Sequence, residues 1–273
     1  IPSRLVGSEM CIRDSLRIDY SILDQHAESY RKIRNTFRYL LGNLNDNFEQ
    51  IDLEKIKIEN LPELEQFMLH KIYNLNSKFC KYFKDYDFHN LYKELLNFCT
   101  VDLSAFYFDI RKDTLYCDPI ISEKRKSTLI LLNVILNSLI RWFAPILSFT
   151  TEEIYQLISK NKKSIHLEKF LNFPEKFKNS NLNSKWEQLI KIRDICNLSI
   201  EQKRASKDIG SSLEAALIVK LNNENQKLLK NIDLSELCIT SSVKIENGDT
   251  NEVIVETSKA KGEKCPICWK ISS

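Results

Sequence analysis

The chain has 273 residues and a formal net charge of +3, which is too small to indicate a nucleic-acid-binding protein by itself. It contains only 5 glycines and 6 prolines, and this scarcity of turn-forming residues argues against a β-sandwich or β-barrel and favours a mainly helical fold. Its 8 cysteines are mostly scattered, which suits reduced thiols in the cytoplasm better than a disulfide framework.

The first segment, residues 1–15, shows neither an amphipathic period nor continuity with the pattern that follows. It begins with Ile1 rather than methionine, and "IPSRLVGSEMCIRDS" has the character of translated adapter sequence. A native flexible arm is the alternative. We expect residues 1–15 to be non-native, and we expect the far end of the sequence to be incomplete as well.

Residues 16–160 are predicted to form a series of amphipathic helices, because apolar residues recur there every three or four positions. The expected helices cover residues 18–44, 62–83, 87–110, 122–144 and a stretch from residue 150 onward. Thr150 with Glu153 three residues later predicts a capping box at the start of the last helix. Short connections between long amphipathic helices predict an antiparallel bundle.

The most apolar stretch, residues 129–147, is a candidate for either a core helix or a membrane span. Asn133, Asn137 and Arg141 interrupt it at intervals of four residues, which makes one helix face polar, and Pro145 then ends it. We therefore expect a core helix and no membrane contact. The polar stripe could read RNA bases, but an internal hydrogen-bond network is the favoured interpretation.

The next part, residues 161–210, is predicted to be a connection followed by a helix. Residues 161–184 are rich in Asn, Lys and Ser, which is typical of a connection over the surface. The helical pattern resumes over residues 186–206.

A small α+β unit is predicted over residues 211–258, because the apolar period changes there from about 3.6 to about 2. The expected elements are strands at residues 215–221, 237–245 and 252–257 and a short helix at residues 223–232. Asn247, Gly248 and Asp249 predict a hairpin-type turn between the last two strands.

The final segment, residues 259–273, contains "KCPICWK". Cys265 and Cys268 are spaced as one half of a tetrahedral zinc site, which normally takes four ligands. No second pair follows in this sequence, so we expect the first half of a zinc-binding module that holds zinc poorly. An unliganded reduced pair is the alternative. A redox pair is less favoured, because no helix follows that would lower a thiol pKa.

Two basic clusters could contact RNA phosphates. They are Arg31, Lys32, Arg34 and Arg38 in the first helix, and Lys203, Arg204 and Lys207 near residue 206. The alternative for the first cluster is a solvated face or ion pairs with carboxylates such as Asp24 and Glu28. The alternative for the second is a favourable interaction with the negative end of its own helix.

Other polar residues have structural interpretations. Tyr107, Asp109, Arg111, Lys112 and Asp113 could organise an RNA-facing end of the bundle, but we favour a buried or half-buried ion-pair network that fixes helix register. The isolated histidines show no metal-ligand spacing and are expected to be structural or exposed.

In the order of its segments the chain resembles the C-terminal part of isoleucyl-tRNA synthetases, which are class I aminoacyl-tRNA synthetases. The resemblance is carried by "YRKIRNTFRYLLGNLND", "SAFYFDIRKDTLYCD", "RKSTLILLNVILNSLIRWFAPILSFTTEEIYQ", "KWEQLIKIRDICNLSIEQKRASKDIGSSLEAALIV" and the closing "KCPICW". It covers nearly all of residues 16–273. It implies an anticodon-binding helical bundle over residues 16–160 and the start of a zinc module that four cysteines hold in that family.

The resemblance also implies a function for an intact enzyme of which this chain is a part. That enzyme is expected to be cytoplasmic and monomeric, and to join isoleucine to tRNA(Ile) with ATP and Mg²⁺. The HIGH-like and KMSKS-like signatures of the family are absent from this sequence, so no catalytic residue is assigned and no activity is expected of the chain alone. A valyl- or other branched-chain synthetase fragment and a free-standing helical RNA-binding or scaffold protein remain as alternatives.

Overall fold

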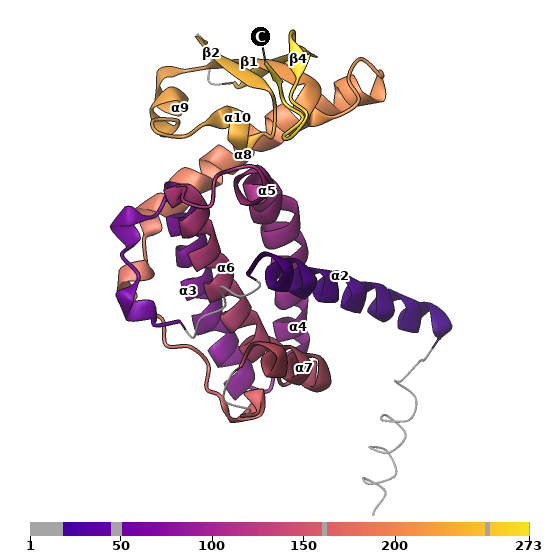
Figure 1. Ribbon diagram of the computed structural model, residues 1–273, viewed down its shortest axis with the longest axis vertical. Helices are drawn as coiled ribbons and strands as arrows, with labels where there is room; N and C mark the ends of the chain where they lie inside the picture. The colour runs from indigo at the N-terminus through magenta and orange to yellow at the C-terminus, as the bar shows by residue number, and fades with distance from the viewer. Residues whose placement is uncertain (1–18, 45–50, 160–162, 249–251, 273) are drawn as a thin grey trace, which may run out of the picture.

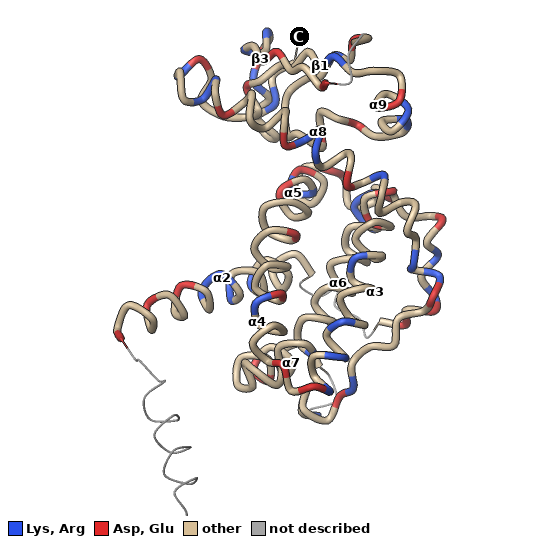
Figure 2. The backbone as a smooth tube through the Cα atoms, turned by 180° about the vertical axis from the view of Figure 1, so that it is seen from behind, with Lys and Arg blue, Asp and Glu red and all other residues tan. Residues whose placement is uncertain are grey.

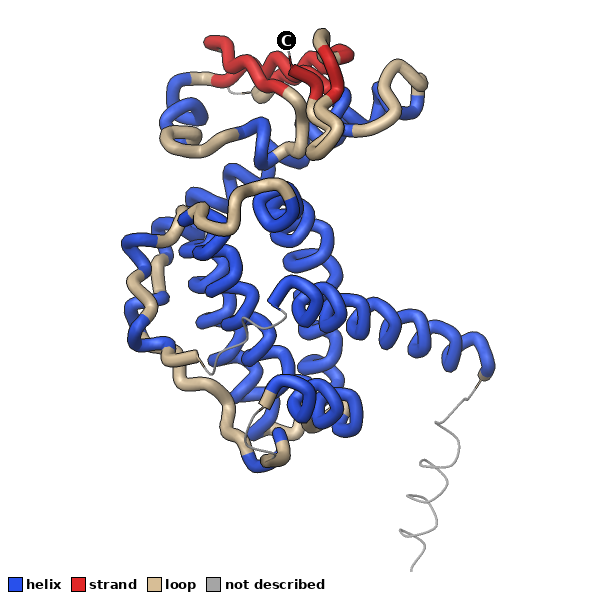
Figure 3. Tube along the Cα trace, in the orientation of Figure 1, coloured by secondary structure: helices blue, strands red, loops and turns tan. Residues whose placement is uncertain are grey.

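The computed structural model describes residues 19–44, 51–159, 163–248 and 252–272. Within them the chain forms a helical bundle with a small sheet-containing unit at one end (Figures 1 and 3). The prediction of a mainly α fold with a small α+β unit is thus confirmed. Residues 1–15, which we expect to be non-native, lie outside the described residues.

The bundle is built from helices of 8 to 26 residues. These are α2 (Tyr20–Leu44), α3 (Glu63–Lys84), α4 (Phe88–Asn97), η4 (Phe98–Phe108), α5 (Asp109–Tyr116), α6 (Glu123–Phe143), α7 (Ser148–Ile158) and α8 (Ser180–Ala205). The segments α4, η4 and α5 follow one another without a break, so the helix predicted for residues 87–110 extends to Tyr116. Its middle part, η4, is a π-helix, which the apolar pattern did not predict.

The central helix is α6, in which every residue from 131 to 144 is buried. Trp142 lies in the core as predicted, where it makes edge-to-face contacts with Phe79 and Phe98 and donates a 3.0 Å hydrogen bond to Asn76. Among the described residues, no helix is long and apolar enough to cross a membrane. The burial of residues 131–144 places this apolar stretch in the core of the bundle.

The polar stripe of α6 forms the internal network that the sequence favours. The amide of Asn137 donates to the backbone and side-chain oxygens of Asn133 at 3.0 and 2.9 Å. Arg141 donates in turn to the side-chain oxygen of Asn137 at 3.1 Å and to Glu168 at 3.3 Å. These residues of α6 are buried, so the network holds the helix against its neighbours.

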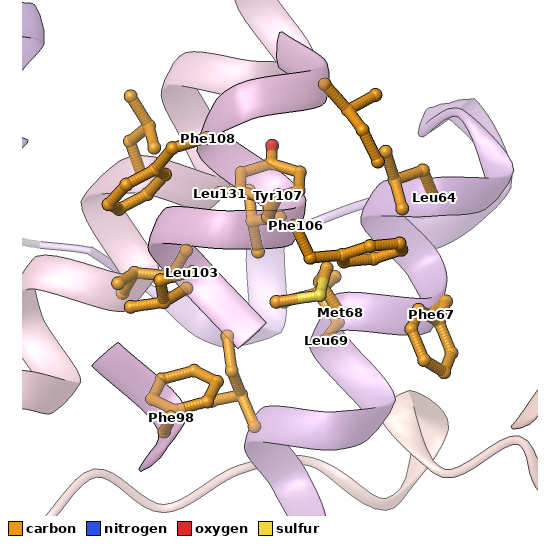
Figure 4. Packing of buried hydrophobic residues seen from close by; sticks show 14 of the residues in the cluster. Leu64, Phe67, Met68, Leu69, Phe98, Leu103, Phe106, Tyr107, Phe108 and Leu131 are labelled. Carbon is orange, nitrogen blue, oxygen red and sulfur yellow. The ribbon is translucent and has the colours of Figure 1, made fainter. Parts of the chain in front are cut away.

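Helix α3 contributes Leu64, Phe67, Met68 and Leu69 to the core, where they lie close to side chains of η4 (Figure 4). The ring of Phe67 stacks on Trp186 with centroids 5.2 Å apart, and Phe106 meets both rings edge-on. Fully burying one such large apolar side chain stabilises the fold by about 1.5–3 kcal/mol. The start of α3 after Pro62 agrees with the prediction, since the missing proline N–H costs nothing there.

The predicted capping box at the start of α7 is wrong. The chain turns immediately after α6, with the Leu147 N–H bonded to the Phe143 carbonyl at 2.7 Å, so α7 already begins at Ser148. Thr150 therefore lies inside the first turn. Its hydroxyl pairs with that of Tyr30 on α2 at 2.9 Å instead of capping the helix.

Short 3₁₀ turns line the connections of the bundle. They are η2 (Leu53–Lys55), η3 (Ile58–Asn60), η5 (Ile165–Leu167) and η6 (Glu175–Phe177). The connection before α8 is more than a surface loop, because Ile165, Phe173 and Phe177 are buried in the core. Helix α8 begins at Ser180, earlier than predicted, because the Asn179 side chain caps it by accepting from the Leu182 N–H at 3.0 Å.

The second unit packs a three-stranded sheet against α8. Its elements are η7 (Ser212–Glu214), β1 (Ala215–Leu221), α9 (Asn223–Leu228), α10 (Leu234–Leu237), β2 (Ser242–Asn247) and β3 (Ile254–Lys259). The strand order is β2-β1-β3, with β2 parallel and β3 antiparallel to β1. Alternate residues of β1 are buried, as its period predicts.

The predicted hairpin between β2 and β3 is therefore wrong, since these strands lie on opposite edges of β1. The segment between β1 and β2 contains α9 and α10 and forms the crossover that a parallel pair requires. The strand predicted from residue 237 begins only at Ser242, because residues 234–237 belong to α10. Gly248 instead bonds to the Leu221 carbonyl at 2.9 Å, and a Cβ there would lie 3.3 Å from the β1 backbone.

Candidate nucleic-acid interface and metal half-site

Helix α2 projects from the bundle and is anchored only through its second half (Figure 1). Its buried residues are Ile33, Thr36, Phe37, Leu40 and Leu44. The predicted basic residues Arg31, Lys32, Arg34 and Arg38 are all exposed on this anchored part of the helix. Acidic residues dominate the free end of α2 instead, as Figure 2 shows.

Two of these cations already have partners within the chain. Arg31 pairs with Glu28 at 2.5 Å, as the alternative interpretation anticipates, but both side chains are largely exposed. Such a surface pair contributes at most about 1 kcal/mol and leaves the arginine able to bind another anion. Arg34 donates to the Tyr30 hydroxyl at 3.1 Å and lies 4.0 Å from Glu153 on α7.

The hydrogen bonds of Tyr30 with Thr150 and Arg34 shift the pKa values of Tyr30 and Arg34. Hydrogen bonds from Thr150 and then from Arg34 lower the pKa of the Tyr30 hydroxyl, because they stabilise its charged form. The same bond to Tyr30 raises the pKa of Arg34. Arg34 is therefore held in place at the contact between α2 and α7.

The second basic cluster lies at the end of α8, beside the sheet. Lys203 pairs with Asp208 at 3.0 Å and Arg204 with Glu201 at 2.6 Å; Lys203 is half-buried and the other three residues are exposed. Lys207 follows the helix with a left-handed φ of 61°. Lys203 and Arg204 lie in the last helical turn, where the dipole favours them in any case. Contact with RNA remains a prediction for this cluster.

The polar residues near the end of the third predicted helix differ in burial: Tyr107 and Arg111 are buried, whereas Asp109 and Lys112 are exposed. Arg111 donates to both carboxylate oxygens of Glu65, at 2.6 and 2.7 Å, and Tyr107 adds a bond of 3.0 Å. The favoured interpretation of a buried network is confirmed for Tyr107 and Arg111. The sequence did not point to Glu65, because a glutamate in the first turn of a helix is also typical of an exposed position.

Arg111 also connects the bundle to the second unit. Its Nη1 atom donates to Glu236 of α10 at 2.8 Å, and Lys124 of α6 reaches the same carboxylate at 2.5 Å. Burial lowers the pKa of Arg111, but the charge and hydrogen bonds of Glu65 outweigh this effect and raise it overall. Asp109 and Lys112 take no part in this network and line a cavity beside α2.

The cysteine pair lies in a small knuckle between β4 (Glu263–Lys264) and β5 (Ile271–Ser272). The Cys265 N–H bonds to the Lys270 carbonyl at 2.8 Å, and Trp269 takes a left-handed φ of 63° to close the turn. Hydrogen bonds from the N–H groups of Cys268 and Ile267, and from the Cys268 thiol, lower the pKa of Cys265. These features suit a thiolate that ligates a metal.

The knuckle fits one half of a tetrahedral thiolate site. Among the described residues, no group of three or more His, Cys, Asp or Glu side chains could hold a metal ion. Cys238 is buried near Cys196, which raises the Cys238 pKa, so it is unsuited as a further ligand. The seven cysteines of the described chain are all free thiols.

The structural role expected of the histidines is confirmed at His70. Its ring is buried on α3, and Nδ1 accepts the Asn179 N–H at 2.9 Å while Nε2 pairs with Asn74 at 2.9 Å. Burial lowers the pKa of this imidazole.

Comparison with known proteins agrees with this architecture. The family model for the anticodon-binding domain of tRNA ligase matches residues 65–220, from α3 to the end of β1. An isoleucine–tRNA ligase of Pelagibacter ubique is 66% identical over 259 residues, which is 95% of this chain and 29% of the relative. Isoleucine–tRNA ligases of Bartonella henselae and Agrobacterium fabrum are each 38% identical over 93% and 94% of this chain. The chain spans less than a third of these relatives, at 29%, 27% and 27% of their lengths.

Proposed function

We propose that this chain is the tRNA-holding C-terminal part of an isoleucine–tRNA ligase. The chain belongs to the family of anticodon-binding domains of tRNA ligases. The observation that carries the proposal is the 66% identity to the Pelagibacter ubique enzyme over 95% of this chain. The intact ligase would form isoleucyl-adenylate from isoleucine and ATP and transfer the isoleucyl group to tRNA(Ile). This part would grip the anticodon stem and loop, so that the acceptor end of the tRNA reaches a distant catalytic core.

The basic residues supply the electrostatic part of this grip. Arg31, Arg34 and Arg38 share one side of α2, and Lys32 lies on an adjacent side. Guanidinium groups bind phosphate oxygens in a bidentate manner, and each neutralised phosphate releases counterions. We assign Lys203, Arg204 and Lys207 a second contact with the tRNA, because Arg204 and Lys207 are exposed beside the sheet unit and the half-buried Lys203 lies on the same helical turn.

The remaining cofactors follow from the proposed identity. ATP and Mg²⁺ would bind outside this chain, in keeping with the absence of both class I signatures from its sequence. Cys265 and Cys268 would hold zinc together with a second cysteine pair, and the metal there would be structural. We propose a cytoplasmic and monomeric enzyme, and the free state of the described cysteines supports a reducing compartment.

The comparisons favour this proposal over its alternatives. The three relatives named above are isoleucine–tRNA ligases, which disfavours a valyl- or other branched-chain synthetase. The match to a tRNA-ligase domain over residues 65–220 disfavours a free-standing scaffold protein.

The experiment that tests the proposal measures binding of a tRNA(Ile) transcript to the chain by fluorescence anisotropy at several salt concentrations. We expect salt-sensitive binding, and a variant with Arg31→Gln, Arg34→Gln and Arg38→Gln should lower the slope of log K against log salt by about one unit per lost phosphate contact. No isoleucine-dependent pyrophosphate exchange is expected from the chain alone.

A charge-matched control separates specific contacts from net charge. Lys81, Lys84 and Lys93 are exposed on α3 and α4, and changing all three to glutamine removes the same charge. The control should leave the slope nearly unchanged. Failure of the chain to bind the transcript at low salt would refute the proposed function. Equal slopes of log K against log salt for both triple variants would mean that the α2 arginines form a solvated surface and do not contact the tRNA.

A further inference from the structure

Two buried cysteines meet where the second unit packs on α8. Cys196 belongs to α8, and Cys238 directly follows α10 as its C-cap residue. Cys196 is 0% exposed and Cys238 is 2% exposed, and both are free thiols that hydrogen-bond to each other. They are far apart in the sequence, so the fold brings them together.

A separate hydrogen bond sets the contact between the two elements. Arg193, about one helical turn before Cys196 on α8, donates from Nε to the Leu237 carbonyl at 2.9 Å. Leu237 directly precedes Cys238, so this bond holds the end of α10 beside the turn of α8 that carries Cys196. The Cys238 N–H bonds in turn to the Leu234 carbonyl at 3.0 Å. The backbone around Cys238 is therefore fixed with respect to α8.

The chain makes a strained turn directly after Cys238. Ile239 has a left-handed φ of 56°, which is rare for a β-branched residue. The Thr240 N–H bonds to the Ser235 carbonyl at 2.9 Å and closes the end of α10. Strained backbone of this kind persists only where the surrounding structure holds it, and it is concentrated at sites with a function beyond packing.

The environment gives the two thiols different reactivities. The hydrogen bond with Cys238 lowers the pKa of Cys196, whereas the same bond, together with burial, raises the pKa of Cys238. The thiolate is the nucleophilic form of cysteine, so Cys196 is the thiol that reacts first. The nearby Arg193 guanidinium opposes the increase in the Cys238 pKa and favours the later ionisation of this second thiol.

Packing alone would need only one cysteine at such a position. A single buried cysteine behaves as a small apolar residue. Cys99 of η4 is an example, since it is 0% exposed and its thiol hydrogen-bonds to Thr36. Two thiols in hydrogen-bond contact are instead close to the sulfur–sulfur distance of about 2.05 Å in a disulfide. Because both are buried, an oxidant that reaches them must be as small as hydrogen peroxide.

We propose that Cys196 and Cys238 form a reversible disulfide when the chain meets hydrogen peroxide, and that this bond ties α10 covalently to α8. In the first step the Cys196 sulfur attacks one peroxide oxygen, the O–O bond breaks, and hydroxide leaves with the electron pair. In the second step the Cys238 sulfur attacks the sulfenic acid at Cys196, the S–O bond breaks, and a second hydroxide leaves.

The two thiol protons convert both hydroxides to water, so two electrons pass from the two sulfurs to one peroxide molecule. A small dithiol reverses the reaction by thiol–disulfide exchange and is itself oxidised to a disulfide. In a reducing compartment the pair stays reduced until peroxide is present, in keeping with the transient, redox-sensing disulfides of cytoplasmic proteins.

The test treats the full chain with a small excess of hydrogen peroxide under native conditions. Remaining thiols are then blocked with iodoacetamide in denaturant, and the chain is digested without reductant for mass spectrometry. We expect a cross-linked peptide pair that contains Cys196 and Cys238 and that disappears after treatment with dithiothreitol. Oxidation should raise the melting temperature by about 4–16 °C, because the bond closes a long loop that contains β1 and α9.

Variants assign these effects to the pair. Cys196→Ala should abolish both the cross-link and the rise in melting temperature. Cys238→Ala should leave Cys196 without its partner, so that Cys196 gains two oxygens as a sulfinic acid. The matched control Cys99→Ala removes an equally buried thiol and should keep both effects of peroxide. The double variant Cys265→Ser, Cys268→Ser should also keep them, which excludes the knuckle as their source.

The wild-type measurement is decisive even where a variant does not fold. Complete alkylation of Cys196 and Cys238 after peroxide treatment that oxidises Cys265 and Cys268 would overturn the inference and leave the buried pair as packing. A cross-link that forms only in denaturant, or one that lowers the melting temperature, would also overturn it, because neither fits a bond that fastens the native fold. No readout involves tRNA, so the result is independent of the proposed function.

Discussion

The buried ion pair of Glu65 and Arg111 has a stability contribution that can be predicted and measured. Glu65 is 0% exposed and the Arg111 side chain 4% exposed, and two hydrogen bonds of 2.6 and 2.7 Å join them. Replacing Glu65 by alanine leaves the guanidinium in the interior with the partly exposed Glu236 as its one remaining ion-pair partner in the described part of the chain, and it removes the acceptor of the Tyr107 hydroxyl. Removing one member of a buried ion pair costs about 3–5 kcal/mol, so we expect Glu65→Ala to lower the free energy of unfolding by that amount.

Replacing both partners should be much less harmful than replacing one. The double variant Glu65→Leu, Arg111→Met buries apolar groups of similar size and leaves no charge unpaired, since Glu236 keeps its 2.5 Å ion pair with Lys124. Buried ion pairs replaced in this way are often neutral in stability, so we expect the double variant within about 2 kcal/mol of wild type. The assay is urea denaturation followed by far-ultraviolet circular dichroism, which reports the helices of the bundle.

An exposed ion pair provides the control for this prediction. Glu28→Ala removes the largely exposed pair with Arg31 and should cost less than about 1 kcal/mol. In thermal melts, Glu65→Ala should lower the melting temperature by roughly 6–20 °C. The reasoning would be refuted if Glu65→Ala lowered the free energy of unfolding no more than Glu28→Ala does. It would also be refuted if the double variant lost as much free energy of unfolding as its two single variants together.

Two further predictions concern titration and metal binding. Because burial lowers the pKa of His70, the unfolded chain binds a proton there before the folded chain does, so stability is lost as pH falls below about 6.5. His70→Gln should show a smaller drop in melting temperature between about pH 7.5 and about pH 5.5, as measured in parallel thermal melts. Because Cys265 and Cys268 supply two of the four ligands that zinc takes, the chain should retain well under one zinc after dialysis, measured by atomic emission. One tightly held zinc per chain would contradict this, and Cys268→Ser should remove whatever zinc is retained.

The bundle could be predicted from the sequence because its helices carry the signals that local physics supplies. Apolar residues on one face of α2 and α3 repeat with the helical period, and the polar stripe of α6 shares one side of its helix. The sequence predicted a later start for α8 than the structure shows, because the start depends on Asn179. The N–H of Asn179 is bonded to His70, more than a hundred residues earlier in the chain. The π-helical form of η4 also escaped prediction, because its apolar residues suit an ordinary helix equally well.

The sheet shows where a local pattern stops being informative. Alternating residues correctly predicted three strands, but the pattern holds no information on which strands are neighbours. Asn247 and Gly248 resemble a hairpin turn, yet Gly248 serves to bring the chain close to β1 at Leu221. The topology depends on the short helices α9 and α10, because they form the connection between β1 and β2 that lets these two strands pair in parallel.

The candidate site was predictable only where its residues lie together in the sequence. The cations of α2 and the pair Cys265 and Cys268 are each separated by a few residues, so their spacing alone indicates their chemistry. Glu65 and Arg111 are 46 positions apart and meet through the packing of α3 against η4 and α5. The cavity beside Lys32 likewise exists only because three helical segments meet there.

Helix α2 carries the residues that hold the fold and the residues proposed to bind tRNA on different sides. Ile33, Phe37 and Leu40 are at most 1% exposed and fix the helix on the bundle, whereas Arg31 and Arg38 are exposed and contribute little to stability. Substitutions of these exposed arginines should therefore change binding without changing the melting temperature, while substitutions of the packed residues should change both. The packed face of α2 sets the direction in which its cations point, so a loosened core should weaken the proposed tRNA binding even with every arginine in place.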